Sequence, residues 1–273
     1  MLDHNIPTIV KVFFRTFFGL LFFSPIIFIN FRTVFKTSRL KLHILRLCCT
    51  TMAIGCTYYT YTHLPMSLAA AIGFSGPLIT TLFAVGFLNE HMTFRRWSAL
   101  LTGYVGVLIV VDPTGVVHHA VWVDLIGNCF LAGHILIARY FSDTEARSTI
   151  LAYSNVGLFV IGSLGLVLYL CIFHNISVIA PSGIPWSPEW KDVILMSIMG
   201  GFGTLTQFCY IAALKNAEAS FLAPFEYSRL VFAIPIGVFF FREKWPSLTE
   251  CIGTFVIILS TLYVVYVARK EKT

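Results

Sequence analysis

Nine long apolar runs follow one another along this 273-residue chain, and they limit what it can fold into. A helix needs about 20 mostly apolar residues to cross the hydrocarbon of a bilayer. Unpaired backbone amides are costly in lipid, so runs of this length are expected to be helical. The sequence therefore predicts an all-α integral membrane protein with about nine transmembrane helices. The predicted spans are residues 7–31, 43–63, 66–88, 97–112, 122–141, 148–172, 191–213, 217–241 and 247–268.

The composition agrees with a chain whose main partner is the lipid bilayer. Hydrophobic residues make up 57% of the chain and charged residues only 12%, whereas about a quarter of the residues of soluble domains are charged. The net charge of +6 comes from basic residues between the apolar runs, without the clustered basic patch and interleaved aromatics of a nucleic-acid surface. The seven cysteines lack C-x-x-C spacing. We therefore expect no nucleic acid, metal or cofactor.

The basic residues also give the spans a direction, because basic loops stay on the cytoplasmic side. If the N-terminus lies outside the cell, only three of the basic residues between the spans lie on the outer side, namely Lys191, Arg242 and Lys244. An odd number of spans then places the C-terminus in the cytoplasm. Thirteen fall inside, namely Arg32, Lys36, Arg39, Lys41, Arg46, Arg95, Arg96, Arg139, Arg147, Lys215, Arg269, Lys270 and Lys272.

An internal repeat relates residues 64–90 to residues 217–243. The two segments run in opposite directions across the membrane in the predicted topology, which makes the repeat an inverted one. The matching pairs at constant offset are Ser67 with Ser220, Ala70 with Ala223, Phe74 with Tyr227, Ser75 with Ser228, Phe87 with Phe240 and Glu90 with Glu243. Glu90 and Glu243 close their helices near loops, and we interpret both as structural.

The repeat predicts two units of unequal length. Residues 113–273 hold five spans, whereas residues 1–112 hold four, so a helix is missing at the front. The natural start lies upstream, or the chain works with an incomplete first unit. The first alternative is favoured because Lys11 and Arg15 follow so soon after Met1, unlike the pattern of an anchoring first span.

One segment carries a resemblance to a known family. The stretch SLAAAIGFSGPLITTLFAVGFLNEHMTFRRWSALLTGYVGVLIVV resembles the fourth and fifth helices of EamA-type transporters of the drug/metabolite transporter superfamily, and residues 217–260 look like the same module again. The motif TSRLKLHILR, followed by NEHMTFRRW, is similar to the branch of S-adenosylmethionine uptake carriers, which is close to riboflavin carriers. The ten-helix family pattern lacks its first helix here.

The resemblance implies a secondary transporter of the bacterial inner membrane that moves a small-molecule solute by alternating access. S-adenosylmethionine or a similar zwitterionic or nucleoside-like solute is the first expectation. The alternatives are riboflavin, an amino acid or a drug, and, more distantly, an intramembrane lipid-modifying enzyme. No catalytic residues are expected, and both a monomer and a homodimer stay open. ATP cannot drive the carrier directly, since the sequence has no G-x-x-x-x-G-K-[ST] loop.

Two opposite charges lie halfway along the span 217–241. Glu226 and Arg229 sit about 14 to 18 Å from its cytoplasmic end at 1.5 Å per residue, where a charge is costly unless it meets a partner or water. They either neutralise each other and clamp helices together, or line a wet cavity in which Arg229 meets an anionic group and Glu226 a cationic group or a proton. Pro224 breaks the helix beside them and favours the cavity.

The other candidate solute contacts are polar or aromatic groups at similar depth. Arg15 is the second deep cation, and it can line the cavity or extend to the interface. Phe74 and Ser75 precede the helix-breaking Pro77 in GFSGP, a motif that also suits close helix packing. His134 and Gln207 are single polar groups in mid-span, which are more typical of interhelical hydrogen bonds. Tyr227 is the repeat partner of Phe74.

Overall fold

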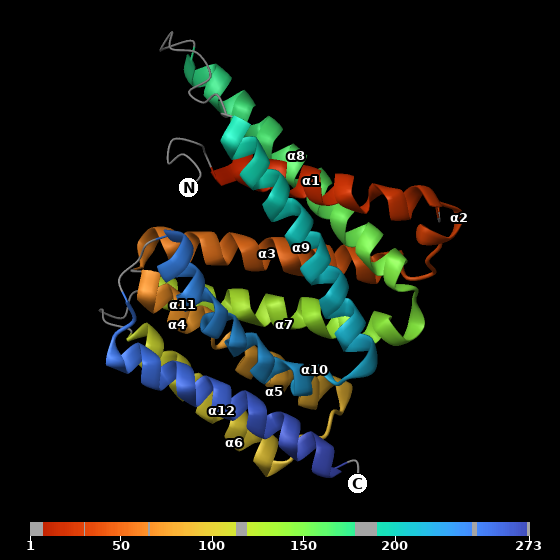
Figure 1. Ribbon diagram of the computed structural model, residues 1–273. Helices are drawn as coiled ribbons and strands as arrows, with labels where there is room; N and C mark the ends of the chain where they lie inside the picture. Colours follow the sequence, from red (N-terminus) through yellow and green to blue (C-terminus); the bar gives the residue numbers. More distant parts are fainter. Residues whose placement is uncertain are drawn as a thin grey trace. The chain divides into compact units, whose positions relative to one another are not determined.

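The structure is a computed structural model that describes residues 8–29, 31–64, 66–112, 119–177, 190–241 and 245–271. Within these ranges the regular structure is helical and there is no strand (Figure 1). The elements are α1 (Thr8–Ile29), α2 (Phe31–Val34), α3 (Leu40–His63), α4 (Met66–Gly73), α5 (Gly76–Leu88), α6 (Phe94–Val111), α7 (Ala120–Thr144), α8 (Arg147–Ser177), α9 (Trp190–Asn216), α10 (Ala219–Leu222), the 3₁₀ helix η1 (Ala223–Tyr227), α11 (Ser228–Phe241) and α12 (Leu248–Glu271).

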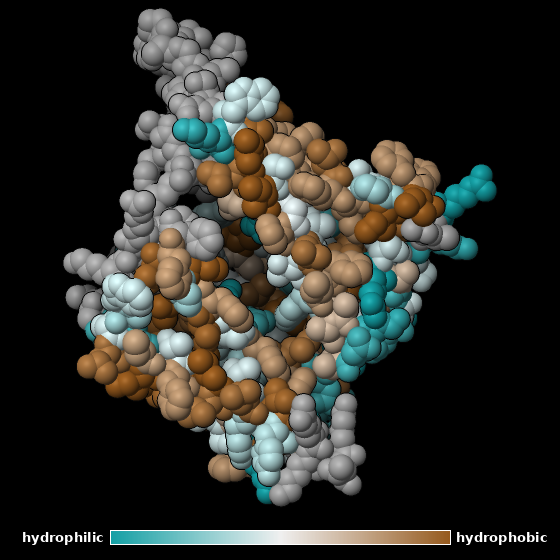
Figure 2. Space-filling view, in the orientation of Figure 1, coloured by the Kyte–Doolittle hydropathy of each residue, from teal (hydrophilic) through white to brown (hydrophobic). Residues whose placement is uncertain are grey.

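Among the residues that the structure describes, seven helical segments are long and apolar enough to cross a membrane. Two further predicted spans correspond to α3, which has 24 residues, and to the interrupted series α10, η1 and α11. Apolar side chains cover much of the visible surface (Figure 2), as lipid requires. The prediction of an all-α integral membrane protein is confirmed. The seven segments are Ile9–Ile29, Leu68–Leu88, Phe94–Val111, Ala120–Thr144, Arg147–Cys171, Trp190–Asn216 and Leu248–Val267.

The chain forms two compact units, each assembled from two separate stretches. Unit 1 comprises residues 1–47 and 141–212, and unit 2 comprises residues 48–140 and 213–273. These units describe packing, whereas the predicted division into residues 1–112 and 113–273 describes a sequence repeat. That division stays a prediction.

In unit 1, small residues let α1 approach α8 and α9. A Cβ atom on Gly162 of α8 would lie 3.0 Å from the Thr16 hydroxyl of α1. A Cβ atom on Gly200 of α9 would lie 2.8 Å from the carbonyl oxygen of Arg15 and from the amide nitrogen of Gly19. Close backbone approach through glycine is typical of helices that pack within a bilayer.

In unit 2, α6 and α12 lie side by side (Figure 1). Their backbones touch, since a Cβ atom on Gly253 would lie 2.7 Å from the carbonyl oxygen of Gly106. Leu100, Val107 and Ile257 are fully buried in the same core. In the predicted repeat these two helices are the last of each half.

Candidate solute-binding site

Both helices of the predicted repeat are interrupted in unit 2. The span 66–88 is divided at Phe74 and Ser75, between α4 and α5, and the span 217–241 is divided by η1. Pro77 and Pro224 lie in the first turns of α5 and η1. Proline is tolerated there because the amide groups of a first turn have no partner within the helix. The predicted helix-break residues thus lie at the two discontinuities.

Side chains from neighbouring helices bind the backbone carbonyls at the first break. The Asn128 amide of α7 donates to the carbonyl oxygen of Ile72 at 2.9 Å and to the Ser75 hydroxyl at 3.2 Å. The Tyr104 hydroxyl of α6 donates to the carbonyl oxygen of Ala71 at 3.4 Å. Such partners are needed wherever a helix is broken at membrane depth. Sequence reasoning missed Asn128, although a carboxamide inside the apolar run 122–141 was a signal.

Three predicted residues meet next to this break. The guanidinium carbon of Arg229 lies 4.4 Å from the centre of the Phe74 ring, within the range of a cation–π contact. The Phe74 and Tyr227 rings lie 6.4 Å apart. Tyr227 is fully buried, and its hydroxyl has no hydrogen-bond partner among the described residues. Arg229 is exposed and Glu226, one position before Tyr227, is half-buried.

The remaining candidates lie on other helices. His134 accepts or donates a hydrogen bond of 2.6 Å with the Thr50 hydroxyl of α3, as expected for an interhelical contact. Arg15 and Gln207 belong to unit 1, on α1 and α9. Arg15 is exposed and Gln207 is half-buried.

Glu90 has a structural role, as expected. Its carboxylate accepts hydrogen bonds from the backbone amides of Ala219 at 2.9 Å and Ser220 at 2.8 Å, at the start of α10. Arg139 lies 4.0 Å from the same carboxylate. Arg96 and Glu218 form an ion pair of 2.9 Å nearby. Residues from the two halves of the predicted repeat therefore hold the start of the second interrupted helix. Glu243, the repeat partner of Glu90, lies outside the described residues.

We expect Asn128→Ala to lower the stability of the protein by about 1–3 kcal/mol, because it leaves a buried carbonyl and hydroxyl without their donor. Thermal unfolding of the purified protein in detergent measures this loss. Asn155→Ala is the matched control, since the buried Asn155 amide donates to the carbonyl oxygen of Leu151 in its own helix. Equal losses in the two variants would contradict the role assigned to Asn128.

The long apolar helices and the two interrupted helices define a multi-pass helical membrane protein. Residues 1–112 and 125–266 match the EamA-like transporter family. The chain therefore belongs to this family and is a membrane transporter, which confirms the resemblance drawn from the sequence. It also argues against the alternative of an intramembrane enzyme.

Several named relatives resemble the chain over most of its length. It is 28% identical over 261 residues to the S-adenosylmethionine uptake transporter of Rickettsia felis, which covers 94% of this chain and 83% of that protein. The protein of the same name from Rickettsia bellii is 29% identical over 266 residues, with coverage of 94% and 84%. The riboflavin transporter of Brucella anthropi is 26% identical over 269 residues, with coverage of 95% and 88%.

A solved crystal structure shares the fold. It superimposes with a TM-score of 0.79 at 12% identity and covers 99% of this chain and 91% of its own. At this identity the likeness concerns the fold alone.

Proposed function

We propose that the protein is a secondary transporter of the bacterial inner membrane whose solute is S-adenosylmethionine or a similar zwitterionic, nucleoside-like molecule. The names of the Rickettsia relatives support this solute class. Riboflavin is the second candidate, because a relative of similar identity carries that name. The basic-residue pattern supports an outside N-terminus and a cytoplasmic C-terminus.

The observation that carries the proposal is the contact of Arg229 with Phe74 at an interrupted helix. An exposed guanidinium at membrane depth is costly in lipid, so a wet chamber that receives an anionic group accounts for it. Glu226, three positions earlier, supplies the opposite charge for an amine or a sulfonium. A zwitterion uses both signs, whereas a purely apolar cargo uses neither.

The discontinuous helices supply the polar backbone of such a site. Interrupted helices in carriers present carbonyl and amide groups to a solute at the bilayer midplane. The 3₁₀ segment η1 carries Glu226 and ends at Tyr227, two positions before Arg229 in α11. In this proposal alternating access exposes that segment to each side in turn, and solute exchange or ion coupling supplies the energy.

Uptake into proteoliposomes tests the proposal, with radiolabelled S-adenosylmethionine and riboflavin offered separately. Glu226→Gln and Arg229→Ala are each expected to lower the uptake rate at least about tenfold, equivalent to about 1.4 kcal/mol. Arg95→Ala is the matched control, because Arg95 is an exposed arginine in the first turn of α6. Unchanged uptake in both test variants would reject the site. Faster uptake of riboflavin than of S-adenosylmethionine would make riboflavin the solute in place of S-adenosylmethionine. Counterflow would separate a carrier from a pore.

A further inference from the structure

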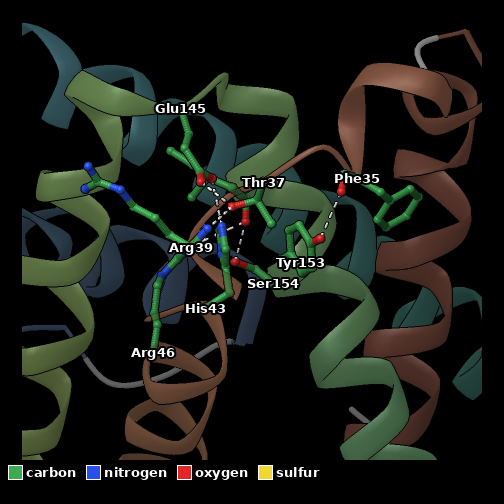
Figure 3. Close-up of polar contacts among 9 residues, drawn as sticks. Phe35, Thr37, Arg39, His43, Arg46, Glu145, Tyr153 and Ser154 are labelled. Carbon is green, nitrogen blue, oxygen red and sulfur yellow. Dashed lines mark hydrogen bonds and ion pairs between the residues drawn. The ribbon is translucent and has the colours of Figure 1, made fainter. Parts of the chain in front are cut away.

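A polar cluster in unit 1 joins two connections that are far apart in the sequence (Figure 3). The Glu145 carboxylate, between α7 and α8, lies 2.7 Å from the His43 Nε2 atom of α3. It also accepts a hydrogen bond from the Thr37 hydroxyl, in the loop between α2 and α3. The Thr37 hydroxyl in turn accepts a hydrogen bond of 3.0 Å from the backbone amide of Arg39. One carboxylate thus holds both connections.

The His43 ring is enclosed on both faces. It stacks on Phe141 with ring centres 4.2 Å apart and on Tyr153 with ring centres 4.3 Å apart, each at an interplanar angle of 21°. The Tyr153 hydroxyl donates to the carbonyl oxygen of Phe35 at 3.0 Å. His43 is only 5% exposed. The imidazole cannot rotate without moving the rings around it.

The second ring nitrogen of His43 has an unmet bonding capacity. Its Nδ1 atom is buried and has no hydrogen-bond partner among the described residues. In a neutral imidazole that donates through Nε2, this atom is an acceptor without a donor. A proton on Nδ1 would turn it into a buried donor without an acceptor, which costs more when the group is charged.

Burial of the ring and the Arg46 charge oppose a second proton, whereas the Glu145 carboxylate favours one. Among the described residues, the titratable groups that act on or pack against the His43 ring are Glu145, Arg46 and Tyr153. Arg46 is 3% exposed and lies one turn further along α3, where it donates to the carbonyl oxygen of Ile150 at 3.4 Å. An imidazolium at this position would place a second buried cation one turn from the Arg46 guanidinium.

We propose that His43 and Glu145 form a proton-binding latch. The latch is closed while the imidazole is neutral, and it opens when a proton binds Nδ1 as the pH falls on the side predicted to be cytoplasmic. Opening releases the α2–α3 and α7–α8 connections from each other. None of these residues is among those proposed to contact the solute, so the latch is a separate binding site for a proton. Only its effect on transport depends on the proposed function.

Thermal unfolding of the full-length protein in detergent tests the latch without any solute. At pH 7.5, above the usual imidazole range near 6.5, wild type should melt a few degrees higher than His43→Gln. A proton bound to His43 destabilises the closed cluster, so the difference in melting temperature between wild type and His43→Gln should shrink as the pH falls to 5.5. Glu145→Gln should likewise melt a few degrees below wild type at pH 7.5, and this difference should also shrink at pH 5.5. His91→Gln, at an exposed histidine, should show no such gap.

A gap that stays constant or widens at pH 5.5 would overturn the proposal, since it would indicate a passive contact or an imidazolium–carboxylate pair. If His43→Gln does not fold, hydrogen exchange of the wild type decides instead. Residues 37–46 should lose protection at pH 5.5 relative to α6 after correction for intrinsic rates, and unchanged protection would reject the latch. Failure of all uptake assays would reject the proposed function while leaving these two results intact.

Discussion

Gly253→Leu is expected to disrupt the packing of α12 on α6 and to destabilise the folded protein strongly. A Cβ atom at this position would lie 2.7 Å from the carbonyl oxygen of Gly106 and 2.9 Å from the amide nitrogen of Val110. Both neighbours are backbone atoms, so no side-chain rotation can make room and a whole helix must move. We expect a loss of about 3 kcal/mol or more, a large part of a typical total stability of about 5–15 kcal/mol.

Size-exclusion chromatography and thermal unfolding in detergent measure this loss. Gly86→Leu is the matched control, because a Cβ atom on the exposed Gly86 would meet nothing within 4 Å. Leucine also favours a helix over glycine by several tenths of a kcal/mol. The control should therefore be monodisperse and at least as stable as wild type. A Gly253→Leu protein that eluted and melted like the control would show that α6 and α12 do not touch as described.

Glu90→Ala is expected to cost about 3 kcal/mol. Glu90 is 9% exposed, and its carboxylate accepts hydrogen bonds from two backbone amides at the start of α10. Hydrogen bonds to a charged group are each worth about 1.5–3 kcal/mol. The variant leaves those amides buried without an acceptor. It should also loosen the segment that carries Glu226, so the uptake rate should fall together with the melting temperature.

Glu250→Ala is the control for Glu90, because it also removes a carboxylate from a helix start. The Glu250 carboxylate accepts a hydrogen bond of 2.6 Å from the backbone amide of Ser247, and the Ser247 hydroxyl accepts one of 3.3 Å from the backbone amide of Glu250. The two residues form an exposed capping box at the start of α12. Water can replace that carboxylate, so the expected loss is about 0.5–2 kcal/mol. Losses of similar size in the two variants would contradict the buried capping role of Glu90.

Properties that depend on a short stretch of chain could be predicted. The length and polarity of each apolar run predicted where the helices lie, because lipid imposes the same requirement on every segment. Pro77 and Pro224 predicted where two of these helices are interrupted, since proline removes a backbone donor whatever its surroundings. The tighter 3₁₀ geometry of Ala223–Tyr227 was beyond local reasoning.

The contacts within the sites could not be predicted in the same way. The sequence suggested Arg229 as a polar group at depth, but its position over the Phe74 ring depends on how two interrupted helices meet. Asn128 was missed because its amide serves carbonyls on another helix. His43 and Glu145 are 102 positions apart, and neither lies in a motif that points to the other.

By itself, the sequence determined that this protein is helical, embedded in a membrane and a member of a transporter family. These properties follow from apolar length, from proline chemistry and from motifs that each lie within one segment. Only the tertiary structure decided which polar groups are paired, because buried charges and broken backbones take partners from whichever helix packs beside them. The Glu90 cap on α10 and the enclosed His43 ring exist through that packing alone.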